Sequence, residues 1–195
     1  MATQRTTETS TGRGFAVRTA RPDDLAAARA LMIRTFEEDF GYGYTPAYHA
    51  DVDDLQGVYL DHPRHALFVA VVDGTGEVVG TAGVRSGGLK PAFNEPWLVA
   101  RYDPERTAQL VRVYTLREWR GRGVARALVA RLLQFVAEEG SYTVVALHTD
   151  PRSPGAERFW RSMPTMLIHD DRDGPSASLH FEMAIPTIGE GDERD

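Results

Sequence analysis

Arginine and glycine alternate in Arg120-Gly121-Arg122-Gly123, a segment that separates a strand-like run from a strongly helical run. Because glycine has no side chain, the backbone of such a segment can approach a ligand closely. The helix predicted to begin at Val124 has unpaired backbone N–H groups in its first turn, at the positive end of the helix dipole. These features together predict a pocket for a phosphate group.

Two common phosphate-binding motifs do not fit this segment. A dinucleotide-binding motif lies near the start of its chain, has a third glycine at the position held here by Arg126, and has an acidic residue about 20 positions later. All three features are missing from this segment. A nucleotide P-loop needs Lys and then Ser or Thr after the last glycine, but Val124 and Ala125 follow Gly123. An ordinary strand-to-helix turn with solvent-exposed arginines stays open as the simpler interpretation.

The stretch from Val113 to Leu128 resembles the acetyl-CoA signature of the GNAT (Gcn5-related N-acetyltransferase) family. That signature reads Arg/Gln-x-x-Gly-x-Gly/Ala after a strand, and Arg120, Gly123 and Ala125 fill its three positions. The resemblance implies that the strand pairs with the pantetheine arm of acetyl-CoA and that the loop holds the pyrophosphate. The residues expected to bind acetyl-CoA are Val113, Tyr114, Thr115, Arg120, Gly121, Arg122, Gly123, Val124, Ala125, Arg126 and, after the next strand, Ser153.

The resemblance also suggests where acid–base chemistry would take place. In ribosomal-protein acetyltransferases of the family, a glutamate on the fifth strand is the base and a tyrosine on the following helix is the acid. His148 and Trp160 occupy the matching positions here. Histidine suits a base role near neutral pH, so His148 is the candidate base, with a packed strand histidine as the alternative. An indole cannot act as a general acid, which leaves water or another tyrosine to protonate the thiolate.

An aromatic and acidic region lies where family members build the acceptor site. Carboxylates and ring faces could together hold a cationic amine. A solvated acidic helix start explains the same residues without a ligand. The residues expected to contact the acceptor are Tyr42, Tyr44, Asp51, Asp53 and Glu95.

The order of the predicted elements agrees with the same family. Strand patterns occur at 15–18, 66–72, 78–84, 110–116, 143–147, 166–169 and 178–185, and helical patterns at 22–36, 47–60, 124–139 and 155–163. The implied fold is α/β, with a mixed, mostly antiparallel sheet of about six to seven strands, splayed between strands 4 and 5 and flanked by about four helices. Residues 86–106 form an atypical insertion, predicted to be a loop or short helices.

Length and composition set wider limits. A chain of 195 residues suits one domain, predicted over 14–185, with polar tails at 1–13 and 186–195 predicted to be disordered. The net charge of −6 and the scattered basic residues argue against a nucleic-acid partner. The chain has no cysteine, which excludes thiolate catalysis and Cys-based metal sites, and we expect no metal. No segment approaches the ~20 apolar residues of a membrane span, so a cytoplasmic protein without a membrane partner is the default.

The sequence therefore predicts an acetyl-CoA-dependent N-acetyltransferase. We expect transfer to a primary amine by direct attack in a ternary complex. We expect this amine to belong to a small molecule, because the 86–106 insertion would narrow the acceptor cleft. Acetylation of a protein or peptide N-terminus is the second enzymatic interpretation. A non-catalytic acyl-CoA-binding module is the third, suggested by Trp160 in the acid position. The identity of the amine, the length of the acyl group and the choice between monomer and homodimer stay open.

Overall fold

The computed structural model describes residues 9–10, 12–41, 43–174 and 176–187. Its centre is an eight-stranded sheet in the order β1-β2-β3-β4-β5-β6-β8-β7. The pairs are antiparallel apart from the parallel β5–β6 pair. The strands are β1 (Thr9–Ser10), β2 (Phe15–Thr19), β3 (Ala66–Val72), β4 (Val78–Ser86), β5 (Thr107–Thr115), β6 (Val144–Thr149), β7 (Thr165–Asp170) and β8 (Leu179–Met183).

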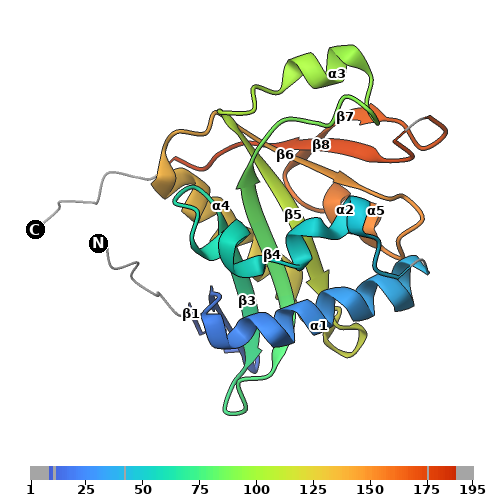
Figure 1. Cartoon of the computed structure of the whole chain (residues 1–195). Coiled ribbons are helices and arrows are strands. Elements are labelled where there is room, and N and C mark those ends of the chain that lie inside the picture. The colour runs from blue at the N-terminus through green and yellow to red at the C-terminus, as the bar shows by residue number, and fades with distance from the viewer. Residues whose placement is uncertain (1–8, 11, 42, 175, 188–195) are drawn as a thin grey trace, which may run out of the picture.

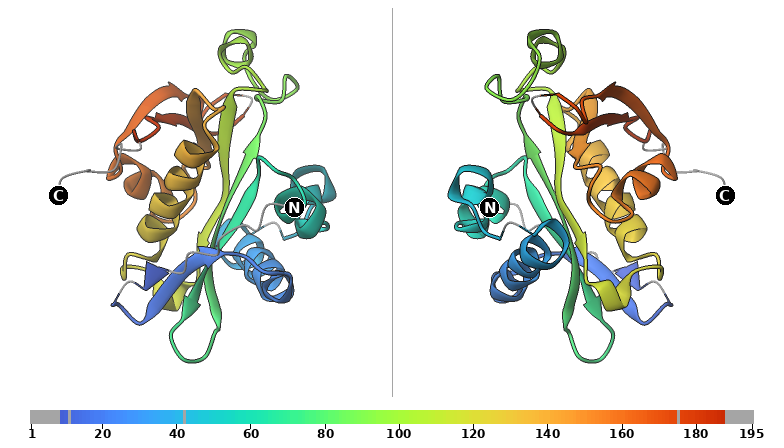
Figure 2. Two further views of the ribbon diagram at one scale, coloured as in Figure 1. Left: turned by 90° about the vertical axis from the view of Figure 1, so that its left-hand side faces the viewer. Right: turned by 90° about the vertical axis from the view of Figure 1, so that its right-hand side faces the viewer.

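Helices cover both faces of the sheet (Figure 1). Seen edge-on, α1 and the segment that contains α2 lie on one face, and α4 and α5 lie on the other (Figure 2). The α-helices are α1 (Leu25–Thr35), α2 (Pro46–His49), α3 (Pro96–Arg101), α4 (Val124–Glu139) and α5 (Ala156–Arg161). Shorter 3-10 and π turns are η1 (Pro22–Asp24), η2 (Phe36–Phe40), η3 (Ala50–Val52), η4 (Gln56–Leu60) and η5 (Arg117–Trp119). Among the described residues, no helix is both long enough and apolar enough to span a membrane.

Helix α4 has the bounds that the sequence predicts, Val124 to Glu139. Its buried side chains recur at helical spacing, and Gly140 ends it with a φ of 78°, a conformation that glycine adopts readily. The helix lies very close to the sheet at Gly80 of β4, where an added Cβ would stand 2.8 Å from Val124 Cγ1. This close approach fixes the start of α4 against the sheet, directly after the glycine loop.

The predicted fold class is confirmed, and three local predictions were wrong. The helix expected over 47–60 is broken into α2, η3 and η4, and at the start of η4 the Asp54 carboxylate accepts a hydrogen bond from the Gly57 backbone N–H at 2.8 Å. A side chain that bonds nearby backbone competes with a continuous helix. The fourth predicted strand, β5, begins at Thr107, three residues before the expected 110.

The third difference concerns the predicted tails. Thr9 and Ser10 form a strand that pairs with Val17 and Ala16 of β2, so this part of 1–13 is ordered by backbone hydrogen bonds. Residues 1–8, 11 and 188–195 lie outside the described part of the chain. The 86–106 insertion carries the short helix α3, as predicted.

Candidate active site

The parallel strands β5 and β6 pair over Thr107–Gln109 and Val144–Ala146. Beyond these residues β5 continues to Thr115 and β6 to Thr149, and the strands separate. The gap opens into a cavity of about 1260 Å³. This volume exceeds the 300–1,000 Å³ of an ordinary small-molecule pocket, so there is room for a long ligand beside a second, smaller one.

The cavity brings together nearly all residues predicted to bind the cofactor. Its lining includes Val113, Tyr114, Thr115, Arg120, Gly121, Gly123, Val124, Ala125, Arg126 and Ser153. Arg122 is not part of the lining, because its guanidinium lies over the Trp119 ring, 4.7 Å from the ring centroid. The segment predicted to bind phosphate therefore faces the cavity through its glycines and the start of α4.

The two glycines of this loop adopt the left-handed backbone conformation. The φ angle is 75° at Gly121 and 86° at Gly123, which stands at the N-cap of α4. Such φ values are costly for residues with a side chain. A Cβ at Gly123 would also lie 2.5 Å from Arg13 Nη1, so the end of the expected N-terminal tail reaches this loop.

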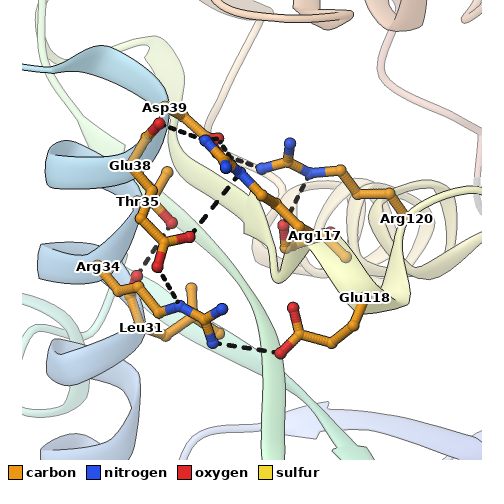
Figure 3. Close-up of polar contacts among 9 residues, drawn as sticks. Leu31, Arg34, Thr35, Glu38, Asp39, Arg117, Glu118 and Arg120 are labelled. Atoms are coloured by element: carbon orange, nitrogen blue, oxygen red, sulfur yellow. Dashed lines mark hydrogen bonds and ion pairs between the residues drawn. The ribbon is translucent and has the colours of Figure 1, made fainter.

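An ion-pair cluster ties the end of the first helix to the loop (Figure 3). The Asp39 carboxylate accepts hydrogen bonds from both Arg117 and Arg120, and Arg120 also donates to the Thr115 carbonyl at 3.1 Å. Burial acts to raise the pKa of Asp39, but the bonds from Arg120 and Arg117 outweigh it and lower this pKa. The charge of Arg120 is thus already partly offset by a carboxylate.

A β-bulge interrupts the middle of β5 and contains an arginine. Thr81 pairs with Tyr114 and Gly83 with Val111, which leaves an extra residue in β5 between these pairs. Arg112 lies in this bulge with a φ of 55°, an unusual value for a residue other than glycine. Its carbonyl accepts a hydrogen bond from the Thr81 hydroxyl at 2.8 Å.

The Arg112 side chain is held by a buried carboxylate. Asp51 accepts hydrogen bonds from Arg112 through both carboxylate oxygens, and the Tyr59 hydroxyl donates to Asp51 at 2.6 Å. Burial acts to raise the pKa of Asp51, but the bonds and the charge of Arg112 outweigh it, so this pKa is lowered. Arg112 was not among the residues predicted from the sequence, although an arginine within an apolar strand pattern is a visible signal.

His148 lies on β6 and lines the cavity opposite the bulged strand. Its side chain is exposed to the cavity, but the cavity walls limit the water that can surround a charged imidazole there. This desolvation, together with the positive charges of Arg85, Arg112 and Lys90, lowers the pKa of His148 to about 4. The sequence supplied only the unperturbed reference of ~6.5, so the structure corrects the pH range in which this residue titrates.

His148 belongs to a chain of polar groups that runs into β8. It pairs with His180 across the strands, with ring centroids 5.9 Å apart. His180 Nε2 lies 3.2 Å from the Ser176 hydroxyl, which donates to Asp171 at 2.6 Å. Desolvation and the neighbouring His148 lower the pKa of His180 to about 4 as well. Both rings are therefore neutral at pH 7 and can accept hydrogen bonds.

Two aromatic residues of the cavity wall, Trp160 and Tyr114, pack against neighbouring rings. Trp160 is buried and its ring centroid lies 4.8 Å from that of Phe159, so no hydroxyl occupies the position of the family's acid. Tyr114 packs edge-on against Phe36 and Phe40, with centroid distances of 5.8 and 5.9 Å. Its hydroxyl is 3.4 Å from Arg112 Nη1.

Of the residues predicted to contact the acceptor, the four that the structure describes, Tyr44, Asp51, Asp53 and Glu95, do not line the cavity. Tyr44 donates to Asp53, which also receives a hydrogen bond from Arg29 at 3.3 Å, and all three form a separate exposed cluster. Asp51 accepts hydrogen bonds from Arg112 and Tyr59 in the buried network described above. Glu95 is the exposed N-cap residue of α3, and Tyr42 lies outside the described residues.

The comparison with known families agrees with this geometry. Residues 29–163 match the family described as "Acetyltransferase (GNAT) family". The protein belongs to the GNAT family. The match covers the helix α1 end, the bulged strand, the glycine loop, α4, His148 and α5.

Among curated proteins, the GNAT chain is similar to mammalian acetyltransferases over part of their length. It is 29% identical over 117 residues to N-acetylaspartate synthetase of Rattus norvegicus, which covers 60% of this chain and 33% of that protein. It is 32% identical over 115 residues to N-acetyltransferase 8 of the same species, covering 59% and 46% of the two chains. The chain thus spans between a third and a half of the length of these relatives.

Solved structures share the fold at low identity. A GNAT acetyltransferase of Staphylococcus aureus Mu50 superposes with a TM-score of 0.67 at 12% identity, covering 88% of this chain and 99% of that one. Nourseothricin acetyltransferase gives a TM-score of 0.57 at 22% identity, covering 89% and 99%. These likenesses support the GNAT fold of the chain.

Proposed function

We propose that the protein transfers an acetyl group from acetyl-CoA to the primary amine of a small molecule, by direct attack within a ternary complex. The observation that carries this proposal is a single cavity that joins the loop Gly121–Arg126 to His148 across the gap between β5 and β6. The loop suits phosphate groups, and the gap suits an extended arm that pairs with exposed strand backbone. His148 supplies a neutral base beside the end of that arm.

The charge of the cavity also fits acetyl-CoA. Seven arginine or lysine residues line it against two aspartates, although the whole chain has a net charge of −6. On the loop side, Arg126 and Arg158 face the cavity, and Ser153 lies at the turn before α5. An anionic donor with several phosphate charges is attracted to such a concave cationic surface.

The reaction needs two proton movements and no further reactant. The amine nitrogen attacks the thioester carbonyl carbon, the new C–N bond forms, and the C–S bond breaks to release the CoA thiolate. The amine proton passes to His148, directly or through a water molecule, and the thiolate takes a proton from solvent. The bound geometry supplies the rest of the acceleration by holding the two reactants together.

A small acceptor is favoured by the 86–106 insertion. Its residues Gly88, Leu89, Lys90, Phe93 and Asn94 line the cavity and so restrict the space beside His148. One similar curated protein is named for the synthesis of N-acetylaspartate, which is a small acetylated amine. Both points support a small molecule over a protein chain end.

The test is release of free CoA thiol from acetyl-CoA with a panel of small amines and short peptides, combined with product mass measurement. We expect turnover with a small amine and a product heavier by one acetyl group. Turnover with peptide N-termini alone would support the second enzymatic interpretation. Acetyl-CoA binding without turnover on any amine would support a non-catalytic module.

A further inference from the structure

Two cations stand apart from the other charges of the cavity. Arg85 lies near the end of β4 and Lys90 lies in the segment that follows, and both line the cavity. Within the part of the chain that the structure describes, neither side chain makes a hydrogen bond or an ion pair. Arg85 is nevertheless half-buried. Its charge helps to lower the pKa of Asp51, but both oxygens of that carboxylate accept hydrogen bonds from Arg112. A partly buried cation with no direct partner is stabilised when an anion binds it.

Most other cavity arginines already have partners. Arg112 pairs with Asp51, Arg120 with Asp39 and Arg152 with Asp150. Arg126 donates to the Ser162 hydroxyl at 3.1 Å. Arg158 is a further unpaired cation among the described residues, but it lies on α5, directly after the Ser153 turn assigned to the cofactor. Arg85 and Lys90 are therefore an excess of positive charge at a different part of the cavity.

The strand register separates this pair from the phosphate loop. Arg85 pairs with Gln109, whereas Gly80 pairs with Thr115, the last residue of β5 before the loop region. At about 3.3 Å per residue, the segment of β5 between these two pairs spans roughly 20 Å.

Arg85 pairs with Gln109 of β5, which pairs with Ala146 of β6. His148 stands two residues further along β6, so Arg85 lies on the His148 side of the cavity. Lys90 comes two residues after Gly88, whose carbonyl accepts a hydrogen bond from Gln109. The contribution of both charges to the lowered pKa of His148 agrees with this placement.

We propose that Arg85 and Lys90 form a subsite for the side-chain carboxylate of the acceptor, so that the acceptor is an acidic amino acid. This inference rests on the proposed acetyl transfer. An arginine guanidinium can bind a carboxylate through two parallel hydrogen bonds, and a lysine ammonium adds a point charge. The Gln109 amide donates to the Gly88 carbonyl at 2.8 Å and so holds the start of the Lys90 segment against β5.

The subsite reverses the expectation from the sequence. The acidic residues Asp51 and Asp53 suggested a site for the positive charge of an amine, but neither lines the cavity and both are already bonded to arginines, Asp51 to Arg112 and Asp53 to Arg29. Recognition by Arg85 and Lys90 would instead act on the acid groups of the acceptor. The amine nitrogen is then free to lose its proton next to the neutral ring of His148.

The experiment compares L-aspartate with L-asparagine, which differ by one carboxylate at nearly equal size. We would measure kcat/KM for each, and the KM for acetyl-CoA, in the wild type, Arg85→Gln, Lys90→Gln and Arg85→Lys. Arg106→Gln is the matched control, because it removes the same charge from an exposed residue beside β5 that does not line the cavity. Calorimetric binding of L-aspartate in the presence of CoA provides a readout that does not depend on turnover.

We expect the wild type to prefer L-aspartate. Arg85→Gln and Lys90→Gln should each lower its kcat/KM by about 10-fold or more, the usual effect of losing a hydrogen bond to a charged group. L-Asparagine turnover and the KM for acetyl-CoA should change by less than about 3-fold. Arg85→Lys keeps the charge but loses the two parallel hydrogen bonds, so its preference for L-aspartate should fall between those of the wild type and Arg85→Gln. Arg106→Gln should behave as the wild type.

Three results would overturn the subsite. They are equal wild-type rates with the two amino acids, an equal loss for both in Arg85→Gln, or a rise in the KM for acetyl-CoA, which would assign these cations to donor phosphates. If no amine is turned over, the proposed acetyl transfer fails. The calorimetric comparison then still decides the subsite, since L-aspartate binding must be present in the wild type and lost in Arg85→Gln.

Discussion

At the scale of single residues, His148 combines a favourable position with a weak intrinsic basicity. Its pKa of about 4 means that it is neutral across the physiological range, so it never needs to lose a proton before it accepts one. Brønsted behaviour makes a group of low pKa a less effective base than an unperturbed imidazole. A carboxylate bound next to Arg85 and Lys90 would offset two of the charges that lower this pKa, and would thereby strengthen the base when the acceptor is present.

His148→Gln tests this role. The substitution keeps size and hydrogen bonding but removes basicity, so we expect kcat/KM to fall by about 10²-fold while acetyl-CoA affinity is retained. The rising limb of the wild-type profile between about pH 6 and 9 should belong to the amine, since His148 titrates near 4. It should therefore stay in place in the variant. A variant with the wild-type rate would return His148 to a packing role, and His62→Gln controls for the loss of an imidazole outside the cavity lining.

Gly123 is the loop residue at which we expect a substitution to do the most damage. Gly123→Val would place a branched side chain at a φ of 86°, next to Arg13 and on the wall of the phosphate pocket. We expect a severe loss of acetyl-CoA affinity, measured by calorimetry. Gly140→Val is the matched control, because Gly140 has a φ of 78° but open space around it and no place in the cavity lining. Equal CoA affinity in the wild type and in folded Gly123→Val would show that the phosphate contacts lie elsewhere.

At the scale of elements, the site depends on how α1 and η2 are attached to the loop before α4. Asp39 is the central contact, with a side chain only 7% exposed between Arg117 and Arg120 (Figure 3). Asp39→Asn would leave two arginines without their carboxylate, and we expect the free energy of unfolding to fall by about 1 kcal/mol or more. The neighbouring Arg34–Glu118 pair is about half exposed, so Glu118→Gln should change stability little. Urea denaturation of both variants would check this difference, and equal effects would contradict it.

The elements also show what the sequence could and could not predict. The bounds of α4 and the glycine loop depend on local signals, namely apolar spacing, a start at Val124 and an ending glycine, and they were predicted correctly. The helix expected over 47–60 depended on periodicity alone, which does not reveal that the Asp54 side chain would bond the Gly57 backbone. The Arg112–Asp51 pair joins residues 61 positions apart through a β-bulge, and no local pattern encodes such a contact.

At the scale of the whole molecule, the cavity has a charge opposite in sign to the net charge of the chain. The chain is acidic overall, but its cavity is lined mainly by basic residues, which draws anionic ligands to the gap between β5 and β6. The sequence shows the net charge and the arginines of the loop, but it cannot show that Arg85 and Lys90 join the same wall. That arrangement follows from the register of β4 on β5 and from the insertion that folds over their ends. The positive charge of the site therefore comes from the assembled fold and not from a single motif.

The same environment makes histidine titration a property of the whole fold. Three of the six histidines, His49, His65 and His180, are buried or half-buried and have pKa values lowered chiefly by this burial, that of His180 to about 4. The folded protein therefore resists protonation of these rings where the unfolded chain, with pKa values near 6.5, already takes up protons. Because the unfolded state binds more protons in this range, stability is complete above about pH 6.5 and is lost as the pH falls toward 4.

Denaturation curves between about pH 8 and 2 would test this behaviour. We expect the free energy of unfolding to be nearly level above about pH 7 and to fall between about pH 6.5 and 4, before the carboxylates are protonated. Asp39 and Asp51 have lowered pKa values, so their contribution is present above 3.8 and is lost in a second, more acidic range. A His180→Gln variant should have a shallower slope in the first range and an unchanged loss in the second. A wild-type curve that is level from pH 7 to 5, or a variant with the wild-type slope, would mean that these rings are hydrated well enough to titrate normally in the folded protein.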